Sequence, residues 1–275
     1  FKKGSDEHIF AEVVGFNSGR VMLMPYTDSD GIGPGCIVDN TGDKLTVKVG
    51  EKLIGRIINA IGQPIDGKGP IETTDSYSIA GEPVNPLTRP RIEDIIPFGV
   101  KAIDGLLTIG RGQRMGIFAG SGVGKSTLLG MIAKEVQADI NVIALVGERG
   151  REVLEFIERD LGEKGMSRSV LVVATSDQPA MMRNRCPMTA TAIAEYFKDR
   201  GKNVLLMMDS LTRYAMVGDS LTKKASHKRY GPLTQFTDVS GNGTFTFTRT
   251  KNRYSQELVK SISNESPTPS ALTII

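Results

Sequence analysis

The chain has 275 residues, 39% hydrophobic and 24% charged, which is the composition of an ordinary globular protein. Its formal net charge of +3 is too small to favour a nucleic-acid-binding or membrane-surface protein over a mixed, solvated surface. No apolar run approaches the length of a membrane span, and the length allows about two domains. The cysteines, Cys36 and Cys186, lie in no metal-ligand spacing and are interpreted as inert thiols.

Short β-rich runs separated by turn residues fill the chain from about residue 9 to residue 71. The runs 9–16 and 19–25 flank the turn signal Asn17-Ser18-Gly19, and further runs follow at 31–38 and 44–49. This spacing predicts small antiparallel β structure, for which a barrel is the natural closure. The chain begins at Phe1 without an initiator Met, and small sheets need paired edges. We therefore expect earlier strands to complete the barrel.

Composition changes along the chain suggest the domain organisation. We expect residues 1–75 to form a partial N-terminal β-barrel, and residues 76–98, which are rich in Pro, Gly, Ser and Thr, to form a linker. Residues 99–216 are expected to form an α/β core, followed by an irregular, unassigned tail at 217–275.

Within the core, apolar runs alternate with helical patterns. Strands are expected at 115–118, 142–146, 171–175 and 204–208, and helices at 125–136, 151–161 and 189–199. Pro187 would then lie near the start of the last helix, where proline is tolerated. Continuous apolar strands separated by helices predict an α/β fold with a parallel sheet covered on both faces.

The stretch Met115–Thr127 has the order of a P-loop: an apolar strand, a glycine-rich turn, Lys-Ser-Thr, and then a helix. Glycines allow backbone N–H groups to turn toward phosphate oxygens, and the helix presents its positive end to the same anion. The strict motif has Gly where this chain has Ala119, whereas Gly122 and Gly124 are kept. The residues expected to contact phosphates are Ala119, Gly120, Ser121, Gly122, Val123, Gly124, Lys125, Ser126 and Thr127. Lys125 would reach the β- and γ-phosphates, and the Ser126 hydroxyl would bind Mg²⁺.

Two carboxylates follow apolar strands of the same predicted sheet. Asp209 ends one strand, where P-loop enzymes place a carboxylate that orders the Mg²⁺ shell. Glu148 follows another strand, at the edge where ligands bind in α/β sheets, and could polarise a water molecule beside the γ-phosphate. Arg149 and Arg151 could stabilise phosphate charge or pair across a subunit boundary. The alternative for this segment is a charged helix N-terminus, with Glu152 favouring the helix dipole.

Together, these motifs resemble the catalytic subunits of the rotary-ATPase superfamily, and among them the flagellar branch of the type III secretion export ATPases. The resemblance covers about residues 1–216. It is carried by the segments 12–17, 34–36, 99–114, 118–126, 147–152, 190–197 and 208–216. It implies a RecA-like P-loop core behind a partial small β-barrel.

The resemblance also implies an activity and a setting. The activity would be Mg²⁺-dependent ATP hydrolysis by a homohexamer, with ATP and Mg²⁺ as cofactors. Lys125 would bind phosphate, Ser126 and Asp209 would serve Mg²⁺, Glu148 would be the catalytic base with Arg149 beside it, and Arg213 would lie near the phosphates. The partners would be export-apparatus proteins, chaperones and unfolded export substrates, with no nucleic acid. The enzyme would be cytoplasmic and peripheral at the inner-membrane export gate.

Two segments depart from the family pattern. The resemblance is expected to end at Met216, after which the chain is rich in Ser and Thr, with one strand-like alternation at 243–250. The segment 184–187, Asn-Arg-Cys-Pro, stands where the family usually has small residues. Our hypothesis is a shifted reading frame at both places, which DNA resequencing would test. The alternative is a genuinely divergent tail.

Three other functions remain open from the sequence. One is a subunit of a proton-translocating ATP synthase, whose catalytic branch usually has Gly-Gly-Ala-Gly at the loop. Another is a terminator-type helicase, for which Phe10, Phe16 and Tyr26 are too scattered to form a stacking surface. The last is a nucleotide-binding remnant without catalysis.

Overall fold

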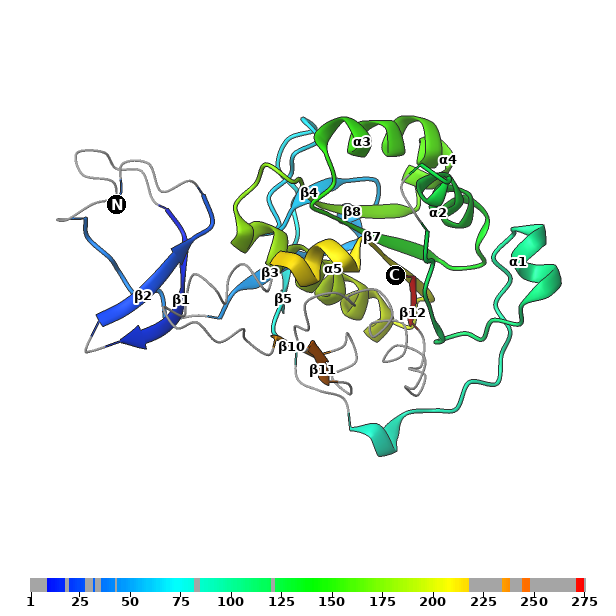
Figure 1. Cartoon of the computed structure of the whole chain (residues 1–275), viewed down its shortest axis with the longest axis horizontal. Coiled ribbons are helices and arrows are strands. Elements are labelled where there is room, and N and C mark those ends of the chain that lie inside the picture. The colour runs from blue at the N-terminus through cyan, green and yellow to red at the C-terminus, as the bar shows by residue number, and fades with distance from the viewer. Residues whose placement is uncertain are drawn as a thin grey trace.

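The computed structural model describes residues 9–17, 20–27, 32, 36–42, 44–81, 85–119 and 122–217, together with the backbone of the strands at 234–237, 244–247 and 271–274. Figure 1 shows a central sheet surrounded by helices, with a β-hairpin set to one side. In the described part of the chain, no helix combines the length and the apolar character needed to cross a bilayer.

A six-stranded parallel sheet forms the centre, in the order β4-β8-β7-β9-β12-β6. Its strands are β4 (Ile57–Asn59), β6 (Arg114–Met115), β7 (Ile140–Val146), β8 (Ser169–Ala174), β9 (Val204–Asp209) and β12 (Ala271–Ile274). Every residue of β7, β8 and β9 is buried, as continuous apolar runs require in a sheet covered on both sides. The predicted parallel α/β fold is confirmed.

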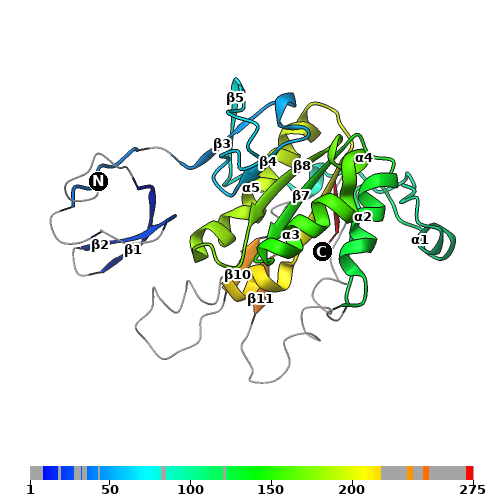
Figure 2. The ribbon, with the colours of Figure 1, turned by 90° about the horizontal axis from the view of Figure 1, so that it is seen from above.

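Helices cover both faces of this sheet (Figure 2). One face packs against α5 (Ala180–Asp199), through alternate residues of the strands such as Val142, Val172 and Leu206. The other face packs against α2 (Lys125–Glu135) and the π-helical segment η3 (Phe156–Leu161), through the intervening residues such as Ile143 and Leu205. The remaining helices are η1 (Glu51–Leu53), η2 (Pro86–Thr88), α1 (Lys101–Leu106), α3 (Gly150–Glu155) and α4 (Gly162–Met166).

Helix α5 begins earlier than the sequence predicts. It starts at Ala180 rather than at Thr189, so Pro187 lies inside the helix and not near its start. Proline in a helix interior removes one backbone hydrogen bond. Packing offsets that loss here, because Met181, Cys186 and Pro187 are all buried. The Cys186 thiol is fully buried and contacts the carbonyl of Val172 at 3.3 Å, and burial raises its pKa.

The N-terminal β structure differs in part from the prediction. Strands β1 (Ala11–Asn17) and β2 (Arg20–Pro25) form an antiparallel pair, and β3 (Thr46–Val49) pairs antiparallel with β5 (Asp75–Ser78). The expected strand at 31–38 is not observed in its described residues, which have no regular structure. Strand β4 pairs parallel with β8, so it belongs to the central sheet and not to the antiparallel part. The domain boundaries at 75 and 98 stay predictions.

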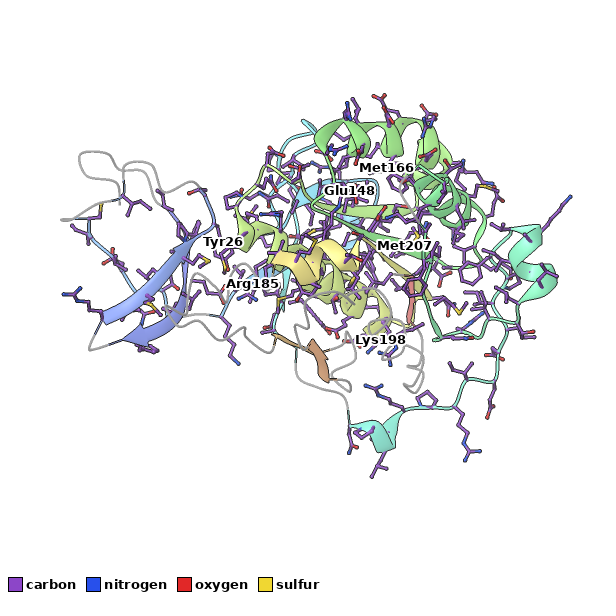
Figure 3. All side chains as sticks on the ribbon, in the orientation of Figure 1. Tyr26, Glu148, Met166, Arg185, Lys198 and Met207 are labelled. Carbon is purple, nitrogen blue, oxygen red and sulfur yellow. The ribbon has the colours of Figure 1, made fainter. Side chains whose placement is uncertain are left out.

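The β1–β2 hairpin contacts α5 through a small polar cluster. Glu12 accepts hydrogen bonds from Arg185, at 2.9 Å from Nε, and from the Tyr26 hydroxyl at 2.6 Å. Tyr26 and Arg185 are labelled at this junction in Figure 3. Residue 185 lies in the segment that departs from the family pattern, yet its side chain has defined partners in the structure.

The C-terminal segment contributes regular structure as well. Strands β10 (Thr234–Thr237) and β11 (Thr244–Phe247) pair antiparallel, and β11 lies within the predicted strand at 243–250. Strand β12 enters the central sheet between β9 and β6. The expectation of an irregular tail is therefore corrected at β10 and β12. The pairing of β12 joins segments far apart in the chain, and such a pairing leaves little signal in a weakly periodic sequence.

The loop after β4 is held by a buried ion pair. Arg56 donates to Asp66 through Nε at 2.6 Å and Nη2 at 2.9 Å, and the Asp66 side chain is only 2% exposed. The backbone N–H groups of Ile57 and Lys68 donate to the same carboxylate. The hydrogen bonds from Arg56 are the main reason that the pKa of Asp66 lies well below its usual range.

Replacing Asp66 with Asn should lower the free energy of unfolding at pH 7 by about 1–3 kcal/mol, because a buried charge pair loses one partner. The contribution of Asp66 is fully present above the unfolded pKa, near 4, and is lost as the pH falls through the depressed folded pKa. The difference between wild type and Asp66→Asn should therefore shrink below about pH 4, as measured by urea unfolding.

The matched control is Glu72→Gln, which breaks the exposed Lys52–Glu72 pair, with side chains 65% and 84% exposed. It should change stability little. Equal effects of the two substitutions, or a difference that grows below pH 4, would contradict the role assigned to Asp66.

Candidate active site

Residues 122–124 of the glycine-rich turn lead directly into α2, whose first residue, Lys125, contacts the carboxyl end of β9. Gly122 and Gly124 have φ angles of 77° and 94°, a left-handed conformation that favours glycine, and no atom lies within 4 Å of the position that a Cβ would occupy. Gly124 is the N-cap residue of α2, and no side chain hydrogen-bonds to the backbone N–H groups at this end of the helix. An uncapped helix N-terminus offers backbone N–H groups to an anion. The expected phosphate contacts Gly120 and Ser121 lie outside the described residues.

Lys125 and Asp209 form an ion pair across the site. The ammonium group of Lys125, in the first turn of α2, donates to Oδ1 of Asp209, the last residue of β9. The Asp209 side chain is 6% exposed and that of Lys125 is 28% exposed. The structure thus brings together the P-loop lysine and the strand-end carboxylate that the sequence singles out.

Glu148 lies beside this pair, just beyond the end of β7, and is labelled in Figure 3. Its side chain is 13% exposed, and Oε2 is 3.0 Å from Nη1 of Arg213. Burial, the nearby charge of Asp209 and a hydrogen bond with Glu152 together raise the pKa of Glu148 to about 7, although Arg213 and Lys125 oppose the shift. A carboxyl group with this pKa can accept or release a proton near neutral pH.

Arg213 packs against the end of β7. It lies in the helical stretch 211–217, and its guanidinium donates to the carbonyl oxygen of Gly147 as well as contacting Glu148. Gly147 has a φ of 70°, and a Cβ at this position would lie 3.3 Å from Cδ of Arg213. Glycine at this point therefore permits the close approach of the arginine.

The other predicted residues lie around this cluster. Ser126 is half-buried in the first turn of α2, next to Lys125, while Ala119 and Val123 are exposed. The Thr127 hydroxyl donates to Asp160 at 3.3 Å. Arg149, which follows Glu148 in the chain, donates to Glu152 at 3.0 Å, and its side chain is 64% exposed.

Sequence reasoning missed two contacts of this site. The sequence pattern connects Glu152 only with the helix dipole, but in the structure Glu152 hydrogen-bonds to Glu148, and this contact lowers the pKa of Glu152. Asp160, at the end of a predicted helix, carries no motif that would connect it with the P-loop. Both contacts arise from the way α3 and η3 pack, which no local pattern specifies.

The donor set fits a magnesium ion only in the presence of a nucleotide. Within the described residues, no group of three or more His, Cys, Asp or Glu side chains could hold a metal ion. Mg²⁺ in nucleotide sites is typically bound by one or two protein oxygens, with phosphates and water completing the shell. The Ser126 hydroxyl, next to Lys125 in the chain, and the Asp209 carboxylate, which pairs with Lys125, are oxygen donors of this kind.

The parallel sheet, the glycine-rich turn and the lysine that opens α2 define a P-loop nucleotide-binding protein. Two models of one family match the chain: the nucleotide-binding domain of the ATP synthase alpha/beta family at residues 99–231, and the beta-barrel domain of the same family at residues 2–42. The chain belongs to the ATP synthase alpha/beta family.

Its relatives include flagellar and secretion proteins. It is 53% identical over 259 residues to the flagellum-specific ATP synthase of Bacillus subtilis (strain 168), covering 90% of this chain and 59% of that protein. It is 51% identical over 205 residues to the type 3 secretion system ATPase of Xanthomonas euvesicatoria, covering 74% of this chain and 46% of that protein. The chain spans about half the length of the curated relatives it matches.

Solved structures agree with this relationship. The assembled ATPase EscN of the enteropathogenic E. coli type III secretion system matches with a TM-score of 0.76 and 40% identity, covering 98% of this chain and 63% of that one. EscN in complex with its central stalk EscO matches with a TM-score of 0.77 and 41% identity, covering 96% of this chain and 62% of that one.

The likeness also continues further than the sequence suggests. The nucleotide-binding model extends to residue 231, past the expected end at Met216. The Bacillus match covers 90% of the chain, which is more than residues 1–216 would account for. The shifted reading frame stays a hypothesis.

The pKa of Glu148 provides a direct test of the site geometry. In the chain without nucleotide, the Glu148 carboxyl should titrate near pH 7 in a carbon-detected NMR experiment. Asp209→Asn should lower this pKa, because it removes a neighbouring negative charge. Arg213→Gln should raise it, because it removes a neighbouring positive charge. A Glu148 carboxyl that titrates near its ordinary value in all three proteins would contradict the observed clustering.

Proposed function

We propose that this chain binds MgATP at the Lys125–Glu148–Asp209 cluster and hydrolyses it, and that the hydrolysis energises flagellar or type III protein export. The observation that carries the proposal is the convergence of a P-loop lysine, a strand-end carboxylate and a carboxyl group of pKa about 7 at one edge of the sheet. The export role is supported by the names of the relatives, flagellum-specific ATP synthases and type 3 secretion system ATPases.

Phosphate binding would begin with an exchange of partners. In the structure Lys125 is neutralised by Asp209. A nucleotide would offer its β- and γ-phosphates to Lys125 and to the backbone N–H groups at the start of α2, including those of Gly122, Gly124 and Thr127. Asp209, released from the lysine, would then be available with Ser126 to hold Mg²⁺. Mg²⁺ held there would supply positive charge that offsets the negative charge of the phosphates.

The remaining residues would serve the attack on the γ-phosphate. Glu148 would orient a water molecule and accept its proton, since its raised pKa places proton uptake near neutral pH. Arg213, which contacts the Glu148 carboxylate, would provide a cation near the phosphates. Arg149 would reach the phosphates only if it left Glu152, its partner in the structure.

The setting of the enzyme is proposed from its relatives. EscN forms an assembly and a complex with a central stalk, so we propose that this chain forms a homo-oligomer, a hexamer, that engages a stalk-like protein of the export apparatus. Chaperones and unfolded export substrates would be further partners. The enzyme would be cytoplasmic, peripheral at the inner-membrane export gate. The net charge of +3 gives no reason to expect nucleic acid.

The decisive test is MgATP hydrolysis by the chain and two variants. Glu148→Gln should lower kcat by about 10²–10⁴ while leaving the Kd of a fluorescent ATP analogue nearly unchanged, because it removes a base and not a phosphate contact. Lys125→Ala should weaken both binding and hydrolysis. The wild-type rate should rise with pH through about 7, as Glu148 loses its proton.

The control is Lys52→Ala, at an exposed ion pair with Glu72, which should leave binding and hydrolysis unchanged. Binding without hydrolysis in every protein would support the nucleotide-binding remnant instead. Stimulation of hydrolysis by nucleic acid would favour a helicase.

A further inference from the structure

A buried carboxylate that the proposed chemistry does not use contacts the P-loop helix. Asp160 lies in the π-helical segment η3 and is 5% exposed. Its Oδ1 accepts a hydrogen bond from the Thr127 hydroxyl at 3.3 Å, and both of its oxygens contact the guanidinium of Arg159, at 3.1 and 3.2 Å. Burying a carboxylate is costly unless it is paired, so these contacts account for its stability there.

The backbones of η3 and α2 are in direct contact at this point. A Cβ at Gly130 would lie 2.4 Å from the carbonyl oxygen of Asp160, so only glycine allows the approach. One turn earlier on α2, Thr127 meets the Asp160 side chain. Asp160 therefore touches α2 twice, and its position relative to that helix is fixed by backbone packing as well as by the hydrogen bond.

The contact reaches the turn that carries the phosphate-binding groups. Lys125, Ser126 and Thr127 form the first turn of α2, and the N-cap Gly124 provides no side-chain hydrogen bond. A capping side chain is one way to fix this end of a helix, and α1, α3, α4 and α5 lack one as well. In α2 the Thr127–Asp160 contact ties down the first turn from the side, which leaves the N–H groups at the helix end available to an anion.

The negative charge of Asp160 repels a phosphate at the start of α2 only weakly. A carboxylate near a helix N-terminus is favourable for the helix dipole. The guanidinium of Arg159, whose side chain is 66% exposed, balances its charge. Asp160 can thus hold the turn without leaving an uncompensated negative charge beside the phosphate site.

We propose that Asp160 is a positioning residue that fixes the first turn of α2 through the Thr127 hydroxyl, and so sets the geometry of the phosphate-binding groups. The inference rests on the nucleotide-binding function proposed above. It assigns to Thr127 a side-chain role distinct from any contact of its backbone N–H with phosphate.

The test measures the Kd of a fluorescent ATP analogue, with Mg²⁺, for the full chain and its variants. Asp160→Ala and Thr127→Val should each weaken binding about three- to tenfold, the range expected for the loss of one ordinary intramolecular hydrogen bond. The double variant should be no weaker than either single one, because both substitutions remove the same interaction. Thr127→Ser, which keeps a hydroxyl, should bind more tightly than Thr127→Val.

The matched control is Glu135→Gln, which breaks the Lys164–Glu135 pair of 2.7 Å at the other end of α2. It touches the same helix but not its first turn, so the Kd should stay within about twofold. Thermal unfolding without nucleotide is recorded for every protein. A merely structural role would lower the melting temperature of Asp160→Ala without changing the Kd. If Asp160→Ala does not fold, the Kd of Thr127→Val, a substitution at an exposed position, distinguishes the positioning role from a structural one.

The outcomes separate this inference from the proposed function. If the unmodified chain binds the analogue and Thr127→Val binds it equally well, the positioning role is overturned while the function stands. Additive losses in the double variant would also overturn the role, because the two residues would then act independently. If the unmodified chain does not bind at all, the proposed function fails, and the inference that rests on it fails too.

Discussion

The ion pair between Lys125 and Asp209 is the contact on which the site depends. It joins the start of α2 to the end of β9 across the edge of the sheet. Removing two charges from water is costly, and a partly buried pair is weak evidence for stability. The pair matters for placement. It holds the ammonium group of Lys125 at the end of β9, and the charge of Asp209 helps to keep the nearby Glu148 carboxyl partly protonated at neutral pH.

The sheet makes this convergence possible. Because β7, β8 and β9 are parallel, the residues that follow them emerge at one edge, beside the glycine-rich turn. Packing on the α2 face then refines the arrangement. The segment from α3 through η3 begins just after Glu148 and ends against α2, so one continuous stretch of chain connects the two sides of the site.

Much of this could be predicted because the signals are local. The unbroken apolar runs of β7 and β9 predict buried strands, and the order of strand, glycine turn and Lys125 predicts the phosphate-binding end of a helix. The early start of α5 could not be predicted from the same rules, because Pro187 argues against it and only burial against the sheet overrides that preference. The pairing of Asp160 with Thr127 and the insertion of β12 join segments far apart in the sequence, and no periodicity reports them.

The burial of Cys186 has a consequence for the motions of the molecule. Its thiol lies between α5 and the sheet, and its raised pKa keeps it protonated and unreactive. Cys36, by contrast, is half-exposed. Alkylation of Cys186 would therefore be the slower phase of a thiol-labelling experiment. Its rate would report how often α5 separates from the strands and exposes this thiol.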